Sequence, residues 1–258
     1  KMDGTLLNTA VWNDKTQSHQ HISSCAFNSS GTLFTIGDSD EGVTGAPGGV
    51  DGVIIAWTYP GLQQIKQQRL GQGGYDFLTA MAPGKDGKMY AGGVQYTPYG
   101  NRWMVQVDDA NGVLWNKTYP NTNENAYRTL VALPDGGVVG AGEFAKQGQF
   151  FVQRLDSSGY EVRHVVLGTS PKTVKILDST RDDSGAIWVA GILLVQYTYE
   201  NWLFRLGPWL DNQCVTPCGP KVWADCADGN DCTTDTCNGG CLQVGNGLAC
   251  SDGNACTN

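Results

Sequence analysis

The chain has 258 residues, of which 40% are hydrophobic and 10% aromatic, so it can form a packed core and is not a wholly disordered chain. Its 35 glycines and its 16% share of charged residues indicate many tight turns rather than long solvated helices. A net charge of −8 without a basic cluster argues against nucleic acid as a partner. No apolar run approaches the length of about 18 residues that a membrane span needs.

The first residues are similar to the end of a repeated unit. Lys1-Met2-Asp3-Gly4-Thr5-Leu6-Leu7 has the order of charged residue, apolar residue, aspartate, turn and strand that begins again at Arg154. Neither an initiator methionine nor a signal peptide opens the chain. We therefore expect the sequence to begin inside a unit, either after processing or as a window of a longer protein, and we favour the window.

A glycine phrase recurs through the first 210 residues. It combines a turn glycine, a short apolar run and a second glycine five or six positions later. The second glycines are Gly37, Gly92, Gly142 and Gly191, at intervals of 55, 50 and 49 residues. Such a regular interval predicts a repeat architecture.

Each phrase lies between short strand patterns. Thr129–Leu133 precedes the third phrase, and in two copies the strand after the phrase runs into an aspartate, a glycine turn and a further strand. The alternating strands that follow the four phrases are 53–57, 103–107, 151–155 and 202–206. Each unit is predicted to hold four short antiparallel strands. The polar segment Gln63–Gln68 is predicted to be loop rather than helix.

One four-stranded sheet cannot bury both of its faces, whereas sheets stacked around an axis can. We predict an all-β fold with a β-propeller of about four blades in residues 1–212 and a small disulfide-rich module in residues 213–258. A long β-sandwich is the rival, but it gives no reason for one phrase to recur at a fixed interval.

The fourth blade, which ends near Trp209, shows no outer strand before Cys214. Residues 1–12 would supply that strand in a closed ring of four blades. Alternatively, the blades belong to a larger ring, which we favour because four blades make an unusually small one.

The best copy of the repeat runs from Met104 to Gly142 and carries its turn residues Asp108, Gly112, Trp115 and Asp135-Gly136-Gly137. With these residues, the first 210 positions resemble the repeats of bacterial secreted β-propellers. The resemblance implies the fold and not an activity, because propellers host many unrelated activities. The blade motif of quinone-dependent dehydrogenases is matched in one blade alone, and the aspartate box of sialidases is missing. The sequence therefore favours neither of these enzyme families.

Eight of the nine cysteines fall in the last 45 residues, a density typical of oxidised modules that lack a large core. They are Cys214, Cys218, Cys226, Cys232, Cys237, Cys241, Cys250 and Cys256. From Cys226 and again from Cys250 the chain reads Cys-x-Asp-Gly-Asn-x-Cys, an offset of 24 residues. This pattern resembles the cysteine-rich repeat of slime-mould prestalk matrix proteins and myxobacterial surface proteins. Zinc is disfavoured because the tail has no histidine, and the disulfide pairing stays open.

The Asp-Gly-Asn triplets offer oxygen ligands beside a glycine turn, as calcium-binding loops do. The candidate ligands are Asp228, Asn230 and Asp235. An Asx turn, in which the side-chain oxygens cap backbone amides, is the alternative that we favour. No other cofactor is predicted.

No catalytic centre is evident. His19 and His21 alternate and could share a metal on a strand, although a surface loop is favoured, and His164 is expected to be solvated. Cys25 is expected to be buried as a small apolar residue. The acidic clusters 38–41 and Asp182-Asp183 are expected to be turn residues, although paired acids would suit a glycosidase.

Tyrosines in or beside the loops between the second and third strands are candidate contacts for carbohydrate or protein, or else pack on neighbouring blades. They are Tyr96, Tyr99, Tyr197 and Tyr199, with Trp202 beside them. The sequence thus predicts a non-enzymatic, extracellular or cell-surface protein for adhesion or assembly, with the propeller as binding module and the cysteine repeats as a stalk. The alternative is a secreted polysaccharide-acting enzyme with its site in the propeller channel.

Overall fold

The computed structural model describes residues 9, 20–40, 49–71, 74–96, 100–110, 112–120, 124–144, 149–167, 173–195, 198–207, 210, 233–237 and 241–245. All regular elements in these ranges are β-strands, which confirms the predicted all-β class. Within the same ranges no helix exists that is long and apolar enough to cross a membrane.

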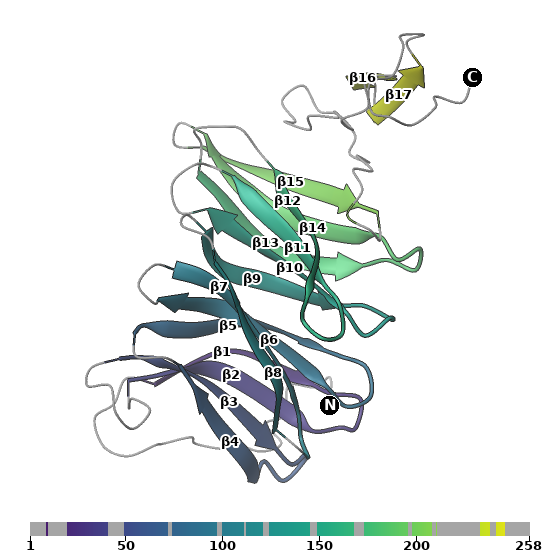
Figure 1. Cartoon of the computed structure of the whole chain (residues 1–258). Helices are drawn as coiled ribbons and strands as arrows, with labels where there is room; N and C mark the ends of the chain where they lie inside the picture. The colour runs from purple at the N-terminus through teal and green to yellow at the C-terminus, as the bar shows by residue number, and fades with distance from the viewer. Residues whose placement is uncertain are drawn as a thin grey trace.

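Strands β1 to β15 form four antiparallel sheets that follow chain order (Figure 1). Sheet 1 holds β1 (Gln20–Phe27), β2 (Leu33–Ser39), β3 (Asp51–Trp57) and β4 (Gln64–Leu70). Sheet 2 holds β5 (Asp76–Pro83), β6 (Met89–Tyr96), β7 (Gly100–Asp108) and β8 (Gly112–Tyr119). Sheet 3 holds β9 (Glu124–Ala132), β10 (Val138–Phe144), β11 (Phe150–Leu155) and β12 (Glu161–Leu167). Sheet 4 holds β13 (Thr173–Arg181), β14 (Ile187–Val195) and β15 (Thr198–Leu206).

Within each sheet the strands pair in sequence order, as predicted for the repeated unit. The prediction of a loop at Gln63–Gln68 is wrong, because most of this segment forms β4 and pairs with β3. Its polar character follows from its place as the outermost strand of its sheet, where the side chains are exposed or half-buried. A short hairpin of β16 (Thr233–Cys237) and β17 (Cys241–Gly245) lies in the tail.

The four sheets stack in order, and the first strand of each later sheet, β5, β9 or β13, packs against the sheet before it. Figure 1 shows the resulting pile of sheets, in which sheets 2 and 3 separate sheet 1 from sheet 4. Three apolar clusters fill the spaces between consecutive sheets. The cluster between sheets 1 and 2 includes the large buried side chain of Trp103, and the cluster between sheets 2 and 3 includes those of Tyr127 and Phe151.

The recurrent glycine has a structural cause that is the same in all four sheets. The first strand carries a β-bulge at Ser23, Thr79, Arg128 and Leu177. The residue before each bulge pairs with a glycine of the second strand, namely Gly37, Gly93, Gly142 and Gly191. A β-carbon on these glycines would lie 1.7–2.5 Å from a carbonyl oxygen of the first strand, so no other residue fits. The sequence pattern suggested Gly92 as the recurrent glycine of sheet 2. The structurally equivalent residue is instead Gly93.

Side chains near the bulges connect one sheet to the next. Ser23 donates a hydrogen bond to the Leu78 carbonyl oxygen at 2.6 Å, and Thr79 donates to the Tyr127 carbonyl. Between sheets 3 and 4 the earlier sheet supplies the acceptor instead of the donor. The Glu143 carboxylate accepts a hydrogen bond from the Ile176 amide at 2.8 Å. Polar side chains at or near the bulges thus connect each pair of consecutive sheets.

Replacing Gly93 by alanine should lower the free energy of unfolding by more than about 2 kcal/mol, because the added carbon meets backbone that cannot move aside. Gly92→Ala is the matched control. Its added carbon would lie 3.1–3.3 Å from the side chains of Tyr127 and Leu130, which can shift. Urea unfolding of both variants measures the difference, and equal losses would contradict the bulge argument.

Candidate functional site

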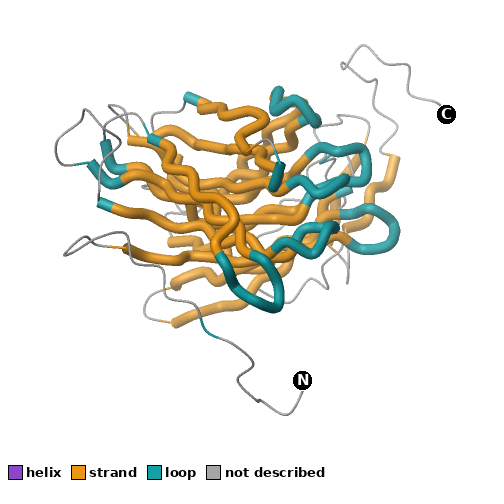
Figure 2. The backbone as a smooth tube through the Cα atoms, turned by 90° about the horizontal axis from the view of Figure 1, so that it is seen from below, coloured by secondary structure: helices purple, strands orange, loops and turns teal. Residues whose placement is uncertain are grey.

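The two ends of the stack differ. Tight turns join first to second strands and third to fourth strands at one end, which we call the turn end. The opposite loop end carries the links between second and third strands and between consecutive sheets. Most of the teal turns in Figure 2 gather at the turn end.

Three carboxylates are buried at the loop end of sheets 1 and 2: Asp38, Asp51 and Asp76. A β-carbon on Gly71 would lie 2.2 Å from Asp51 Oδ1 and 2.8 Å from Asp76 Oδ2, so these two carboxylates converge on one point. Asp76 Oδ1 also accepts a hydrogen bond from the Tyr96 amide at 3.0 Å. These residues come from both sheets, and the backbone joins them there, because the Asp76 amide donates to the Val50 carbonyl at 2.7 Å.

Two tyrosines are exposed beside these carboxylates. Tyr75 precedes β5 and is 58% exposed, and Tyr96 ends β6 and is 40% exposed. Tyr96 packs edge-on against Phe77 with 6.4 Å between the ring centroids. Exposed His21 lies 3.4 Å from Asp38, measured from Nδ1 to Oδ1. We call the exposed residues Tyr75, Tyr96 and His21 the loop-end surface, and the three buried carboxylates lie beside it.

The other predicted contact residues lie elsewhere or outside the described part. Tyr99, Tyr197 and His19 fall outside the described residues, as does the side chain of Tyr199 in β15. Trp202 stacks on Phe150 with 4.7 Å between ring centroids, so its ring packs between sheets 3 and 4. The structure therefore places one predicted tyrosine, Tyr96, on the loop-end surface. Tyr75 was not predicted, although it lies in a link between two units.

Three expectations about single residues are wrong. Cys25 is exposed rather than buried, because it lies on the face of β1 that no described sheet covers. His164 is half-buried rather than solvated: its Nε2 is enclosed, and its ring packs edge-on against Phe151. Asp38 is a buried strand residue of β2 and not a turn residue.

Asp182 fits the expectation of a turn aspartate. Its Oδ1 accepts hydrogen bonds from the amides of Ser184 and Ala186, and its Oδ2 accepts from Trp188 Nε1. The hydrogen bond from Ser184 is the main cause that lowers the pKa of Asp182, with Arg205 contributing. This carboxylate organises a turn and shows no free catalytic geometry.

At the turn end, Asp109 joins sheet 2 to sheet 1. Its Oδ2 accepts hydrogen bonds from the hydroxyls of Thr32 and Ser30, each at 2.9 Å, and from the Asn28 amide at 3.5 Å. The bond from Thr32 is the largest of the effects that lower the pKa of Asp109. Its role is structural.

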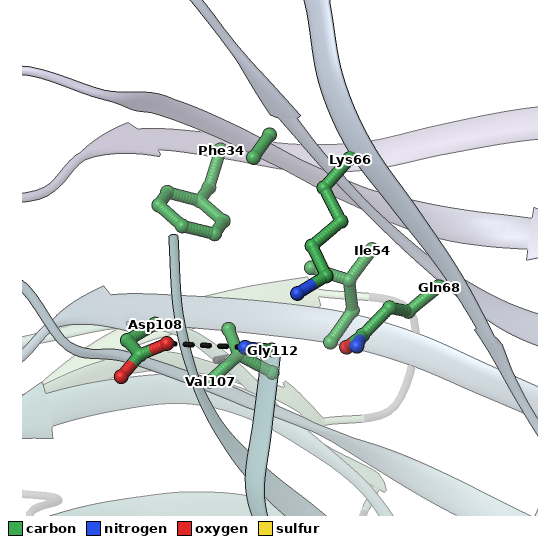
Figure 3. A pocket seen from close by; sticks show the side chains of 8 residues that line it. Phe34, Ile54, Lys66, Gln68, Val107, Asp108 and Gly112 are labelled. Atoms are coloured by element: carbon green, nitrogen blue, oxygen red, sulfur yellow. Dashed lines mark hydrogen bonds between the residues drawn. The ribbon is translucent and has the colours of Figure 1, made fainter. Parts of the chain in front are cut away.

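A narrow cleft lies between the outer strands of sheets 1 and 2 (Figure 3). Lys66 and Gln68 of β4 extend over the turn where Asp108 accepts a hydrogen bond from the Gly112 amide at 3.1 Å. The volume of about 10 Å³ holds about one water molecule, so this cleft is no site for an organic ligand.

Most of the predicted calcium ligands and disulfide cysteines lie outside the described residues. Of the ligands, Asp235 lies in β16, while Asp228 and Asn230 are not described. Of the cysteines, Cys237 and Cys241 lie in the hairpin, and their backbones pair directly. Among the side chains that the structure describes, no group of three histidine, cysteine or acidic residues is placed to hold a metal.

No protein-family model and no curated protein matches this chain. Among solved structures, it is similar to the subtype N11 neuraminidase-like protein of a flat-faced bat virus (H18N11), with 12% identity and a TM-score of 0.42 over 78% of this chain and 64% of that one. It is also similar to a tail fiber of a Staphylococcus aureus phage, with 8% identity and a TM-score of 0.28 over 71% and 49%. The chain spans less than two thirds of either structure, and both scores are too low to establish a shared fold.

Asp109→Asn should destabilise the protein by up to about 1 kcal/mol at neutral pH, since the carboxylate is only half-buried and water weakens its interactions. The folded-state pKa lies below the unfolded value of about 3.9. The stabilisation is therefore complete above that value and is lost as the pH falls through the folded pKa. Urea unfolding from about pH 7 to about pH 3 should show wild type and variant converging. A gap that stays constant, or an equal effect of the exposed control Asp183→Asn, would contradict this role.

Proposed function

We propose that this chain is an extracellular or cell-surface protein for adhesion or assembly, in which the sheets are blades of a β-propeller and bind a partner through the loop-end surface. The cysteine-rich tail serves as a stalk or spacer. The observation that carries the proposal is the pair of exposed tyrosines beside buried carboxylates at the junction of sheets 1 and 2.

The stacking of the sheets supports the propeller. The first strands lie next to one another from sheet to sheet, and the polar fourth strands lie outside. This is the arrangement expected when blades surround an axis. The equivalent glycines occupy the same position in every sheet, as is expected for repeated blades around a common axis.

Carbohydrate is the partner that the loop-end surface suits best. Tyrosine rings offer flat apolar faces for sugar rings, and a hydroxyl at the edge for hydrogen bonds. The Asp76 carboxylate helps to hold Tyr96 in place, because it accepts a hydrogen bond from the Tyr96 amide. The net charge of −8 disfavours strongly acidic glycans as partners.

A secreted polysaccharide-acting enzyme is the second candidate, favoured by one observation. The carboxylates of Asp51 and Asp76 converge on Gly71, and paired acids are the machinery of glycoside hydrolysis. Both carboxylates are buried, however, whereas a polymer substrate needs access to them. Release of reducing sugars that Asp76→Asn abolishes would favour this candidate over binding alone.

Screening the whole chain on a glycan array should reveal binding without turnover. Tyr75→Ala and Tyr96→Ala should each weaken binding at least about tenfold, because each removes a stacking surface. Tyr160→Ala removes an exposed tyrosine from the turn end and serves as the matched control. Equal binding by all three variants would contradict the loop-end surface as the binding site.

The cysteine tail should be oxidised, with one free thiol per chain, that of Cys25. The register of the hairpin makes Cys237 and Cys241 directly opposite partners. Such partners have Cα atoms about 4.5–5.5 Å apart, a separation that suits a disulfide. Thiol titration of the unreduced, unfolded chain should find one thiol, and none in Cys25→Ser. Peptide mapping that links Cys237 to another cysteine would contradict the predicted pair.

A further inference from the structure

The two exposed tyrosines are neighbours across two strands of sheet 2. Asp76 of β5 lies opposite Gln95 of β6, and the Tyr96 amide donates a hydrogen bond to the Tyr75 carbonyl at 3.3 Å, which continues the ladder by one residue. Opposite residues of an antiparallel pair point to the same face of the sheet, with β-carbons about 4.5–5.5 Å apart. Tyr75 and Tyr96 therefore stand side by side in a row that runs across the strands.

The Tyr96 ring is held in position by its neighbours. It packs edge-on against Phe77, with an angle of 84° between the ring planes. The residue opposite Tyr96 in β7 is Gly100. A β-carbon on Gly100 would lie 3.1 Å from Tyr96 Cε1, so the ring lies where another residue would place its side chain. Phe77 and Gly100 thus fix the ring while 40% of Tyr96 stays exposed.

The Tyr75 ring is a second and separate surface. The residue is 58% exposed, and among the described rings Tyr96 contacts Phe77 whereas Tyr75 contacts none. The backbone of Tyr75 is held on both sides, because it forms a parallel bridge with Val50 and accepts the hydrogen bond from Tyr96. Two tyrosine rings are therefore presented separately from a fixed backbone.

The spacing of the two rings indicates the size of the ligand. Neighbouring strands lie about 4.8 Å apart, which is close to the length of one pyranose unit in an extended chain. Consecutive units of a linear chain can therefore meet both rings at once, whereas a single sugar meets one of them. A chain with equatorial linkages stays flat and extended along such a row, and a chain with axial linkages coils away from it.

We propose that the loop-end surface binds an internal stretch of a linear, neutral polysaccharide with equatorial linkages, and that Tyr75 and Tyr96 stack on consecutive units. This inference rests on the proposed carbohydrate binding and names its ligand class. The net charge of −8 disfavours an acidic chain. Phe77 and Gly100 are positioning residues, because they touch the Tyr96 ring and not the sugar.

The test is isothermal titration calorimetry of the full chain with sugars of increasing length. The probes are the mono-, di- and hexasaccharides of equatorially linked glucose, xylose, mannose and N-acetylglucosamine. Axially linked glucose oligosaccharides are the matched control, since they have the same composition. In at least one equatorial series the disaccharide should bind at least about tenfold more tightly than the monosaccharide, and the axial series should show no such gain.

Tyr75→Ala should abolish the gain from monosaccharide to disaccharide, because it leaves one stacking surface. Gly100→Ala should reduce that gain at least about threefold, because its methyl group displaces the Tyr96 ring. Gly61→Ala is the matched control for Gly100→Ala. Its β-carbon would lie 3.4 Å from Thr58 Oγ1, an ordinary contact far from the tyrosines, so it should bind as wild type does.

Three results would overturn the inference: no binding in any equatorial series, a monosaccharide that binds as tightly as its disaccharide, or an equal gain in the axial series. Each of them leaves the proposed function intact if the glycan array still shows binding that depends on Tyr75 and Tyr96. An array without any bound glycan contradicts carbohydrate binding itself, so the two failures are distinguishable.

Discussion

The close approach between a glycine of the second strand and a carbonyl oxygen of the bulged first strand is the constraint on which the rest of the structure depends. The bulge adds twist and directs one side chain of the first strand out of the pairing pattern. In sheets 1 and 2 that side chain is a hydroxyl that reaches the backbone of the next sheet. In sheets 1 and 2 the same local defect therefore both shapes the sheet and connects it to the next one.

The three interfaces share one geometry but differ in chemistry. Between sheets 1 and 2 the contact is between polar turns, and Asp109 accepts hydrogen bonds from the hydroxyls of Ser30 and Thr32. Between sheets 2 and 3, Arg102 is buried over the ring of Phe151, and burial raises the pKa of Tyr119. Aromatic stacking of Phe150 and Trp202 dominates between sheets 3 and 4. These differences favour one order of sheets, since a sheet moved to another position would leave polar groups unmatched.

The sequence predicted the strands and their grouping well, because strand periodicity and turn residues are local signals. It could not choose between Gly92 and Gly93, since the choice depends on a bulge in a strand that pairs with them. Burial was harder to predict, because it depends on which sheets have neighbours. Cys25 is exposed for that reason. Asp38 is buried although its place in the acidic cluster 38–41 predicted a turn. Nothing local indicated that Asp51 and Asp76 meet at Gly71, because they come from different sheets.

Among the strands that the structure describes, each sheet packs on the sheets before and after it in the chain. The stability of such a one-dimensional array is approximately a sum over units and nearest-neighbour terms. A unit added to or removed from either end would leave the remaining junctions almost unchanged, so the number of units can change there during evolution. Nothing in the repeated unit tells the array where to stop, and its length must be set by whatever caps the terminal units.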